Sequence, residues 1–175
     1  MLCLVVEYTG EDAEFPTFTR LHRGATVDLM VEPGESQHKH HALVLVRDAP
    51  WAAIESLVAE LSDRRGPVST MRSDAAELLW FGRITHDPKA SAHPTARAVA
   101  SLLDLIGPPW VHVESGVVHL RARLRDPARA EDVLQLAEDG LRAAGTEAQV
   151  VVQEVSMKDH SVWESLVRHG IGLSA

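Results

Sequence analysis

The first residues in the chain whose types suggest chemistry are the histidines of the run His38-Lys39-His40-His41. Zinc in proteins is held by three or four His, Cys or carboxylate ligands in a tetrahedral arrangement. In an extended segment His38 and His40 point to one side and His41 to the other, and no Cys or carboxylate stands nearby at a ligand spacing. We therefore expect no metal site, and interpret the run as a solvated loop that leads into a strand.

A second candidate is the segment 117–125, in which apolar and basic residues alternate. The basic positions would share one face of a strand and stand about 7 Å apart in series; they are His119, Arg121, Arg123 and Arg125. Because the planar guanidinium group pairs well with carboxylate or phosphate, these are the candidate ligand-binding residues, for an anion or an acidic partner. The alternative is the solvent side of a sheet, with the arginines paired to Glu114 or Glu147.

Signatures of catalysis are absent from the sequence. There is no Gly-x-Gly-x-x-Gly, no phosphate-binding P-loop and no Gly-x-Ser-x-Gly. The single cysteine, Cys3, lies in an apolar opening segment with no obvious base beside it, so a nucleophilic role is not expected. We expect no catalytic residues, no cofactor and no enzyme activity. A small enzyme built from dispersed His and carboxylate side chains stays open as an alternative.

The composition is that of a globular protein able to bury a core. The 175 residues are 45% hydrophobic and 24% charged, and no apolar run approaches the roughly 20 residues that a membrane helix needs. The opening residues lack the pattern of a signal peptide, and one cysteine cannot form an internal disulfide, so we expect a cytoplasmic location without membrane contact. The formal net charge of −8 argues against general affinity for nucleic acid.

The hydrophobic pattern predicts an α+β fold with antiparallel sheets and helices on one face, in two small ferredoxin-like or ACT-like units. Strands are expected at 2–8, 25–32, 42–46, 68–72, 77–84, 110–114, 117–125 and 147–155, with a tight turn at Ser115-Gly116. Helices are expected from an N-cap at Asp48 to Gly66, from 94 to 106, from Asp126-Pro127 to Gly145, and at 161–169.

A polar, helix-breaking stretch near Thr85–His93 divides the chain. We expect a β-rich α+β unit over residues 1–86, an α-β-β-α-β unit over 94–158, and a C-terminal helix and tail over 159–175. The apolar faces of the helices need covering, so the two units are expected to pack on each other.

Four segments in this order also carry a resemblance to a known family. They are the strand Leu4-Val5-Val6-Glu7-Tyr8, the segment Ala25–Leu29 before Glu32-Pro33, the run from Leu43 to Ile84 with its Leu79-Trp80-Phe81, and the stretch Val117–Val155 with Arg125-Asp126-Pro127. With them the chain resembles the N-terminal sensory region of bacterio-opsin-activator-type helix-turn-helix transcription regulators of halophilic archaea. It is a resemblance of pattern over most of the chain, and it supplies no catalytic residues.

The resemblance implies that a DNA-binding domain follows, and Gly172-Leu173-Ser174-Ala175 is where its opening would begin. The expected function is therefore a non-catalytic sensory or regulatory region of a transcription regulator, which binds a small ligand or a protein partner. DNA would be contacted only through that C-terminal domain outside this chain, and a homodimer stays open. A pure protein-interaction module is a further alternative. It would show a flat apolar patch, whereas sensing favours a shallow apolar pocket with few charges.

Overall fold

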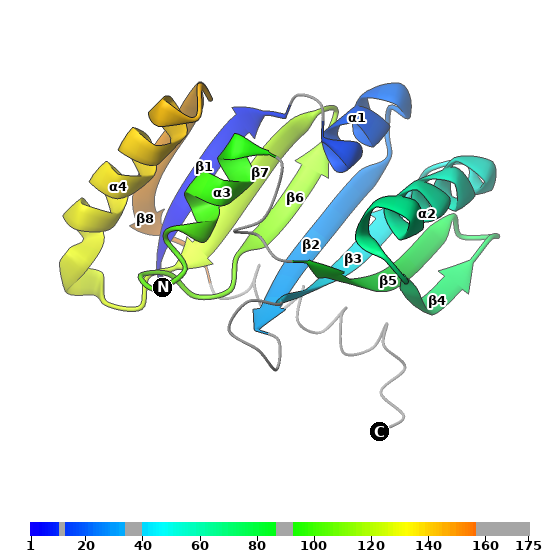
Figure 1. The fold of residues 1–175 in the computed structure, drawn as a ribbon, viewed down its shortest axis with the longest axis horizontal. Helices are drawn as coiled ribbons and strands as arrows, with labels where there is room; N and C mark the ends of the chain where they lie inside the picture. Colours follow the sequence, from blue (N-terminus) through cyan, green and yellow to red (C-terminus); the bar gives the residue numbers. More distant parts are fainter. Residues whose placement is uncertain (11–12, 34–39, 87–92, 157–175) are drawn as a thin grey trace.

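The computed structural model describes residues 1–10, 13–33, 40–86 and 93–156. Within them, eight strands form one antiparallel sheet of order β4-β5-β3-β2-β6-β7-β1-β8, and four α-helices lie on one face of it (Figure 1). The predicted α+β class is confirmed. In chain order the elements are β1 (Leu2–Thr9), α1 (Glu14–Leu21), β2 (Thr26–Pro33), β3 (His40–Arg47), α2 (Trp51–Arg65), β4 (Ser69–Asp74), β5 (Leu79–His86), α3 (Pro94–Ala100), β6 (Trp110–Glu114), β7 (Val117–Arg123), the 3₁₀ helix η2 (Pro127–Arg129), α4 (Ala130–Ala143) and β8 (Ala148–Glu154).

The sheet joins the two halves of the chain. Strand β2 pairs with β6, and β1 pairs with both β7 and β8, so the first strand lies among strands formed by residues beyond 110. The division into ferredoxin-like or ACT-like units over 1–86 and 94–158 stays a prediction. The segment 159–175, with the helix expected at 161–169, lies outside the described residues.

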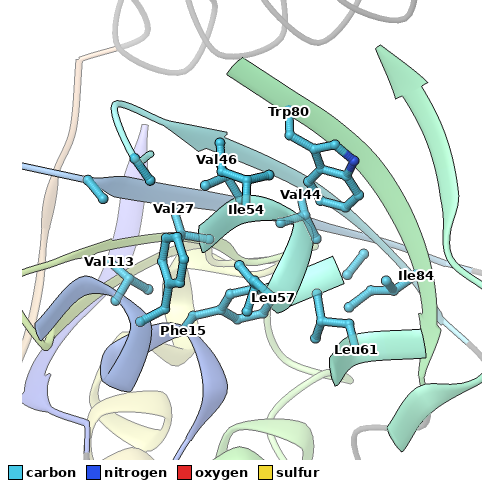
Figure 2. Close-up of a cluster of buried hydrophobic side chains, with 14 of the residues drawn as sticks. Phe15, Val27, Val44, Val46, Ile54, Leu57, Leu61, Trp80, Ile84 and Val113 are labelled. Carbon is cyan, nitrogen blue, oxygen red and sulfur yellow. The ribbon is translucent and has the colours of Figure 1, made fainter. Parts of the chain in front are cut away.

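Alternating strand residues give the sheet two different faces. On the helix face, a first core lies under α1 and α2 and contains the fully buried Ile54, Leu61 and Trp80 (Figure 2). A second core lies under α3 and α4 and contains the fully buried Ile106 and Val133. The opposite face, called here the back face, carries a smaller apolar cluster of Leu43, Leu45 and Phe81, packed with Met30, Leu79 and Trp110.

One glycine is required for the first core. The indole ring of Trp80 lies across Gly82, two residues further along β5, so that a Cβ at Gly82 would stand 2.1 Å from the ring atom Cη2. A strand residue with any side chain would displace the ring. The Trp80 Nε1 atom also donates a hydrogen bond to the Thr70 hydroxyl on β4, at 3.2 Å, which fixes the orientation of the ring.

Several local predictions are confirmed. Ser115 and Gly116 both have positive φ, 49° and 79°, as a two-residue hairpin turn between β6 and β7 requires. The Asp126 carboxylate accepts a hydrogen bond from the Ala128 amide at 3.0 Å, which caps η2. Gly145 follows α4 with a φ of 74°.

Other local predictions are wrong. Asp48 is not the N-cap of α2: it has a φ of 59°, and Pro50 occupies the cap position with no side-chain hydrogen bond. The helix expected over 94–106 ends at Ala100, because the chain continues in tight turns that bring Leu102 and Ile106 into the second core. Helix α1 was not predicted, although Phe15 and Phe18, three residues apart, both enter the first core.

No helix in the described ranges is long and apolar enough to cross a membrane.

Candidate functional site

An apolar cavity of about 270 Å³ opens on the helix face between α1 and α3. It lies at the boundary between the two cores, because Tyr8 and Val111 on its wall pack against both. Its apolar lining comes from the central strands and from both helices; it includes Phe15, Pro16, Leu29, Val31, Pro94, Val99, Leu103, Val111, Val113, Val118 and Leu120. The cavity is therefore a part of the helix face that neither pair of helices covers completely.

Few polar side chains reach this cavity: Tyr8, Glu14, His93 and Thr95. Tyr8 is the only tyrosine of the chain, and burial raises its pKa to about 12, so its phenol is neutral near pH 7. The Thr95 hydroxyl shares a hydrogen bond with the Thr146 hydroxyl at 2.5 Å. An apolar wall with a small number of polar groups is typical of a small-molecule site.

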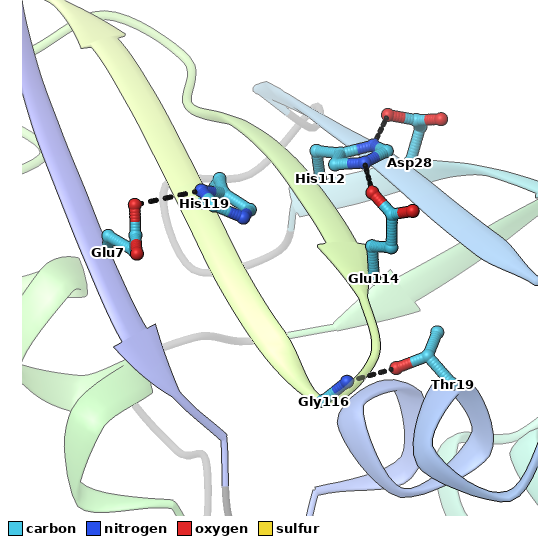
Figure 3. Close-up of polar contacts among 7 residues, drawn as sticks. All are labelled: Glu7, Thr19, Asp28, His112, Glu114, Gly116 and His119. Atoms are coloured by element: carbon cyan, nitrogen blue, oxygen red, sulfur yellow. Dashed lines mark hydrogen bonds and ion pairs between the residues drawn. The ribbon is translucent and has the colours of Figure 1, made fainter. Parts of the chain in front are cut away.

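Helix α1, one wall of the cavity, is held against the β6–β7 hairpin by buried hydrogen bonds. The fully buried Thr19 hydroxyl accepts from the Gly116 amide at 2.9 Å and donates to the Pro16 carbonyl at 3.1 Å (Figure 3). The Arg20 guanidinium donates to the Gly10 carbonyl, and the Gly10 amide donates to the Gly116 carbonyl at 2.9 Å. These bonds fix the position of the wall relative to the strands.

Directly behind the cavity, the back face carries a row of four residues from neighbouring strands: Glu7, His119, His112 and Asp28, here called the histidine row. The strand registers place each opposite the next. His112 Nδ1 lies 2.8 Å from Asp28 Oδ1, and His119 Nδ1 lies 3.3 Å from Glu7 Oε2 (Figure 3). Glu114 Oε2 lies 3.4 Å from His112 Nε2, and the two imidazole rings stand 6.1 Å apart.

The histidine row is suited to holding a proton. The hydrogen bond to Asp28, which is buried, raises the pKa of His112; the Asp28 and Glu114 charges add to this effect, and desolvation opposes it. Since both ring nitrogens of a protonated imidazole are donors, protonated His112 can bind both carboxylates at once. His112 also stands between the cavity residues Val111 and Val113, so the two sites share strand β6.

The predicted basic residues fall in different surroundings. His119 pairs with Glu7, and Arg121 lies over the Trp110 ring with its guanidinium carbon 5.4 Å from the ring centroid. Arg123 ends β7, exposed and opposite Cys3. Arg125 lies beyond β7, and its Nε donates to the Ile106 carbonyl at 2.8 Å, so this guanidinium supports the turn after α3. Ligand binding by the four residues stays a prediction.

The histidine run is only partly described, since His38 lies outside the described residues. His40 and His41 belong to β3. The two ring nitrogens of His41 contact the Thr85 hydroxyl at 3.1 Å and the Arg83 guanidinium at 3.2 Å. Among the residues that the structure describes, no group of three His, Cys, Asp or Glu side chains is placed to hold a metal ion.

Cys3 is buried on the back face, and burial raises the pKa of its thiol. A raised pKa lowers the thiolate fraction near pH 7, and the thiolate is the nucleophilic form of cysteine.

A wider and more polar groove of about 670 Å³ runs between α1 and α2. Its lining includes Thr17, Ser56, Glu60 and Arg64, together with Leu21, which is 74% exposed.

Sequence reasoning did not find the cavity or the histidine row. The members of the row are polar residues at alternate positions of strands otherwise rich in apolar residues, which is a visible signal in β2, β6 and β7. Their meeting depends on strand pairing between distant segments, and alternation alone does not give that pairing.

No protein-family model matches the chain, and no curated protein matches it.

Proposed function

We propose that this chain is a non-catalytic sensory region of a transcription regulator, and that it binds a small apolar ligand in the cavity between its two cores. The observation that carries the proposal is the cavity, whose wall is apolar except for a few polar side chains. The regulator part of the proposal comes from the resemblance to bacterio-opsin-activator-type proteins. The region acts in the cytoplasm, and DNA is contacted only by a domain outside these residues.

The position of the cavity suits a sensor. A ligand there would touch α1 on one side and α3 on the other, and would thereby link the two cores across the sheet. Each Å² of apolar surface that the ligand removes from water contributes roughly 25 cal/mol. A ligand shifts an equilibrium only toward the state that it binds better. A ligand that contacts both α1 and α3 would therefore stabilise the arrangement in which these two helices, and the cores beneath them, stand close together.

The alternative of a small enzyme needs titratable groups that converge in a pocket. The His112–Asp28 pair does not meet this requirement, because it lies on the back face, whereas the cavity opens on the helix face; the titratable side chains that line the cavity are Tyr8, Glu14 and His93. The alternative of a protein-interaction module has one observation in its favour, the α1–α2 groove with the exposed Leu21. A partner segment in that groove would leave the cavity free.

The cavity is tested with apolar probes of increasing size: benzene, indole and naphthalene. An apolar cavity of about 150 Å³ takes benzene, so we expect indole or naphthalene to fit this larger one and to raise the melting temperature with probe concentration. A Val111→Phe substitution should fill the cavity and abolish that rise.

Val5→Phe is the matched control, since Val5 is a half-buried strand valine on the back face. It should leave the response to the probes intact. If no probe raises the melting temperature of the wild-type chain, or if Val5→Phe removes the response as Val111→Phe does, the cavity is not a ligand site.

The division of labour with a DNA-binding domain has its own test. Residues 1–175 alone should show no tight, sequence-specific DNA binding in a gel-shift assay. A specific complex would contradict it.

A further inference from the structure

The two edges of the sheet are built differently. Strand β4 ends the sheet on one side with a register shift between Thr70 and Arg72, and it carries the charged side chains of Arg72 and Asp74. Bulges and charges are the devices by which proteins keep an edge strand from pairing with another chain. Strand β8 ends the other side without a register shift, and its centre is the apolar run Val150-Val151-Val152.

The backbone of β8 offers a regular row of hydrogen-bonding groups. The amide of Val155 donates to the Met1 carbonyl at 2.9 Å, so Val155 and Met1 form a hydrogen-bonded pair. Along an antiparallel ladder, hydrogen-bonded pairs alternate with non-hydrogen-bonded pairs. From that register, the amide and carbonyl groups of Ala148, Val150, Val152 and Glu154 point away from β1. No element in the described part of the chain pairs with this outer side of β8.

We propose that two copies of this chain associate through β8, in antiparallel pairing about a two-fold axis at Val151, so that the two sheets become one. In that register the outward-pointing residues meet one another: Val150 faces Val152 of the second copy, and Ala148 faces Glu154. No charge meets a like charge, although each chain has a net charge of −8. The pairing is thus self-complementary, as a two-fold interface requires.

The side chains support the same arrangement. Val151 is 46% exposed on the back face of an edge strand, where a large apolar side chain is unusual. At the two-fold axis the two Val151 side chains would form a directly opposed, non-hydrogen-bonded pair, the closest kind in an antiparallel ladder. Gln149 and Gln153 would flank them and pair with each other across the interface.

The mass of the full chain is measured by sedimentation equilibrium over a range of concentrations. We expect twice 19.1 kDa for the wild-type protein. Val151→Lys places two ammonium groups side by side at the axis and should weaken association by at least about tenfold. Met71→Lys makes the same kind of change on β4, where Met71 is 39% exposed, and should leave the mass unchanged.

A cross-link keeps the proposal testable if Val151→Lys fails to fold. Opposed residues in this register have Cα atoms at a distance that a disulfide can span. Val151→Cys should therefore give a covalent dimer under mild oxidation, and Met71→Cys should not. A wild-type chain that stays monomeric at all concentrations overturns the proposal. A dimer that Val151→Lys does not weaken, together with no cross-link at Val151→Cys, overturns it as well.

Discussion

The first core under α2 and the cavity beside α3 occupy the same face of the same sheet, yet one is filled and the other is not. Helix α2 has 15 residues, and with α1 it buries the first core around Ile54, Leu61 and Trp80 (Figure 2). The helices that border the cavity, α1 and α3, have 8 and 7 residues. Since an α-helix rises about 1.5 Å per residue, two such short helices do not reach across the central strands.

The length of the covering helices, and not the composition of the strands, therefore decides where this sheet stays open. The strand residues beneath both regions are equally apolar: Val27, Val44 and Val46 under the filled region, Leu29 and Val111 beneath the open one.

The largest effect is expected for a truncation in the filled region. Ile54 is 1% exposed, so Ile54→Ala should lower the free energy of unfolding by about 2–5 kcal/mol. Leu29→Ala at the cavity wall should cost less than about 2 kcal/mol, because Leu29 is only half-buried and already borders empty space. Urea denaturation measures both. Equal costs would mean that the wall of the cavity is packed as tightly as the core.

The second effect concerns the wall itself. Thr19→Val keeps the shape of the buried side chain but leaves the Gly116 amide without its acceptor, which should cost about 1–3 kcal/mol. It should also weaken the binding of indole or naphthalene, because α1 loses its attachment to the hairpin. Thr17→Val, on the exposed side of the same helix, is the control. If both variants melt at the same temperature, the Thr19 bond does not hold the wall.

The third effect is a pH dependence of the histidine row. Because the folded-state pKa of His112 is raised, its contribution to stability is fully present below its ordinary pKa of about 6.5 and is lost as the pH rises through the raised value. His112→Asn should therefore destabilise the protein more at pH about 5.5 than at pH about 8.5.

The expected change is smaller than that of Thr19→Val, since the His112 side chain is 31% exposed. Asp28→Asn should reduce the same pH dependence, because Asp28 supplies the largest part of the shift. Denaturant midpoints at the two pH values measure the effect, and a difference of the opposite sign would refute it.

The smallest effect is expected for the arginines. Replacing the half-buried Arg121 and the exposed Arg123 with Gln should change the free energy of unfolding by about 0–1 kcal/mol, the range for charges at a protein surface. The contact of Arg121 with the Trp110 ring falls within that range. If the pair binds an anionic ligand, the double variant should also lose protection by phosphate or a dicarboxylate in a melting assay. If neither phosphate nor a dicarboxylate raises the melting temperature of the wild-type chain, the two arginines do not bind an anionic ligand and are ordinary surface residues.

Local structure was predictable where neighbouring residues decide it. The turn at Ser115-Gly116, the cap at Asp126 and the alternation of β7 all follow from residue types at short spacing. Helix α1 was missed because it is short and because Leu21, at helical spacing from Phe18, is exposed. Asp48 was misassigned because a residue with a good capping side chain also tolerates the positive φ that the chain needs there.

The class of fold, most strands and the absence of known catalytic motifs thus follow from the residues alone, because periodicity and turn chemistry are local properties. Tertiary structure alone decided that β1 joins β7 and β8, that the sheet is continuous, and that Asp28 meets His112. It also decided where α1 and α3 leave the cavity. The physical reason is that pairing between distant strands is chosen by how the whole apolar surface can be covered, and no single segment carries that information.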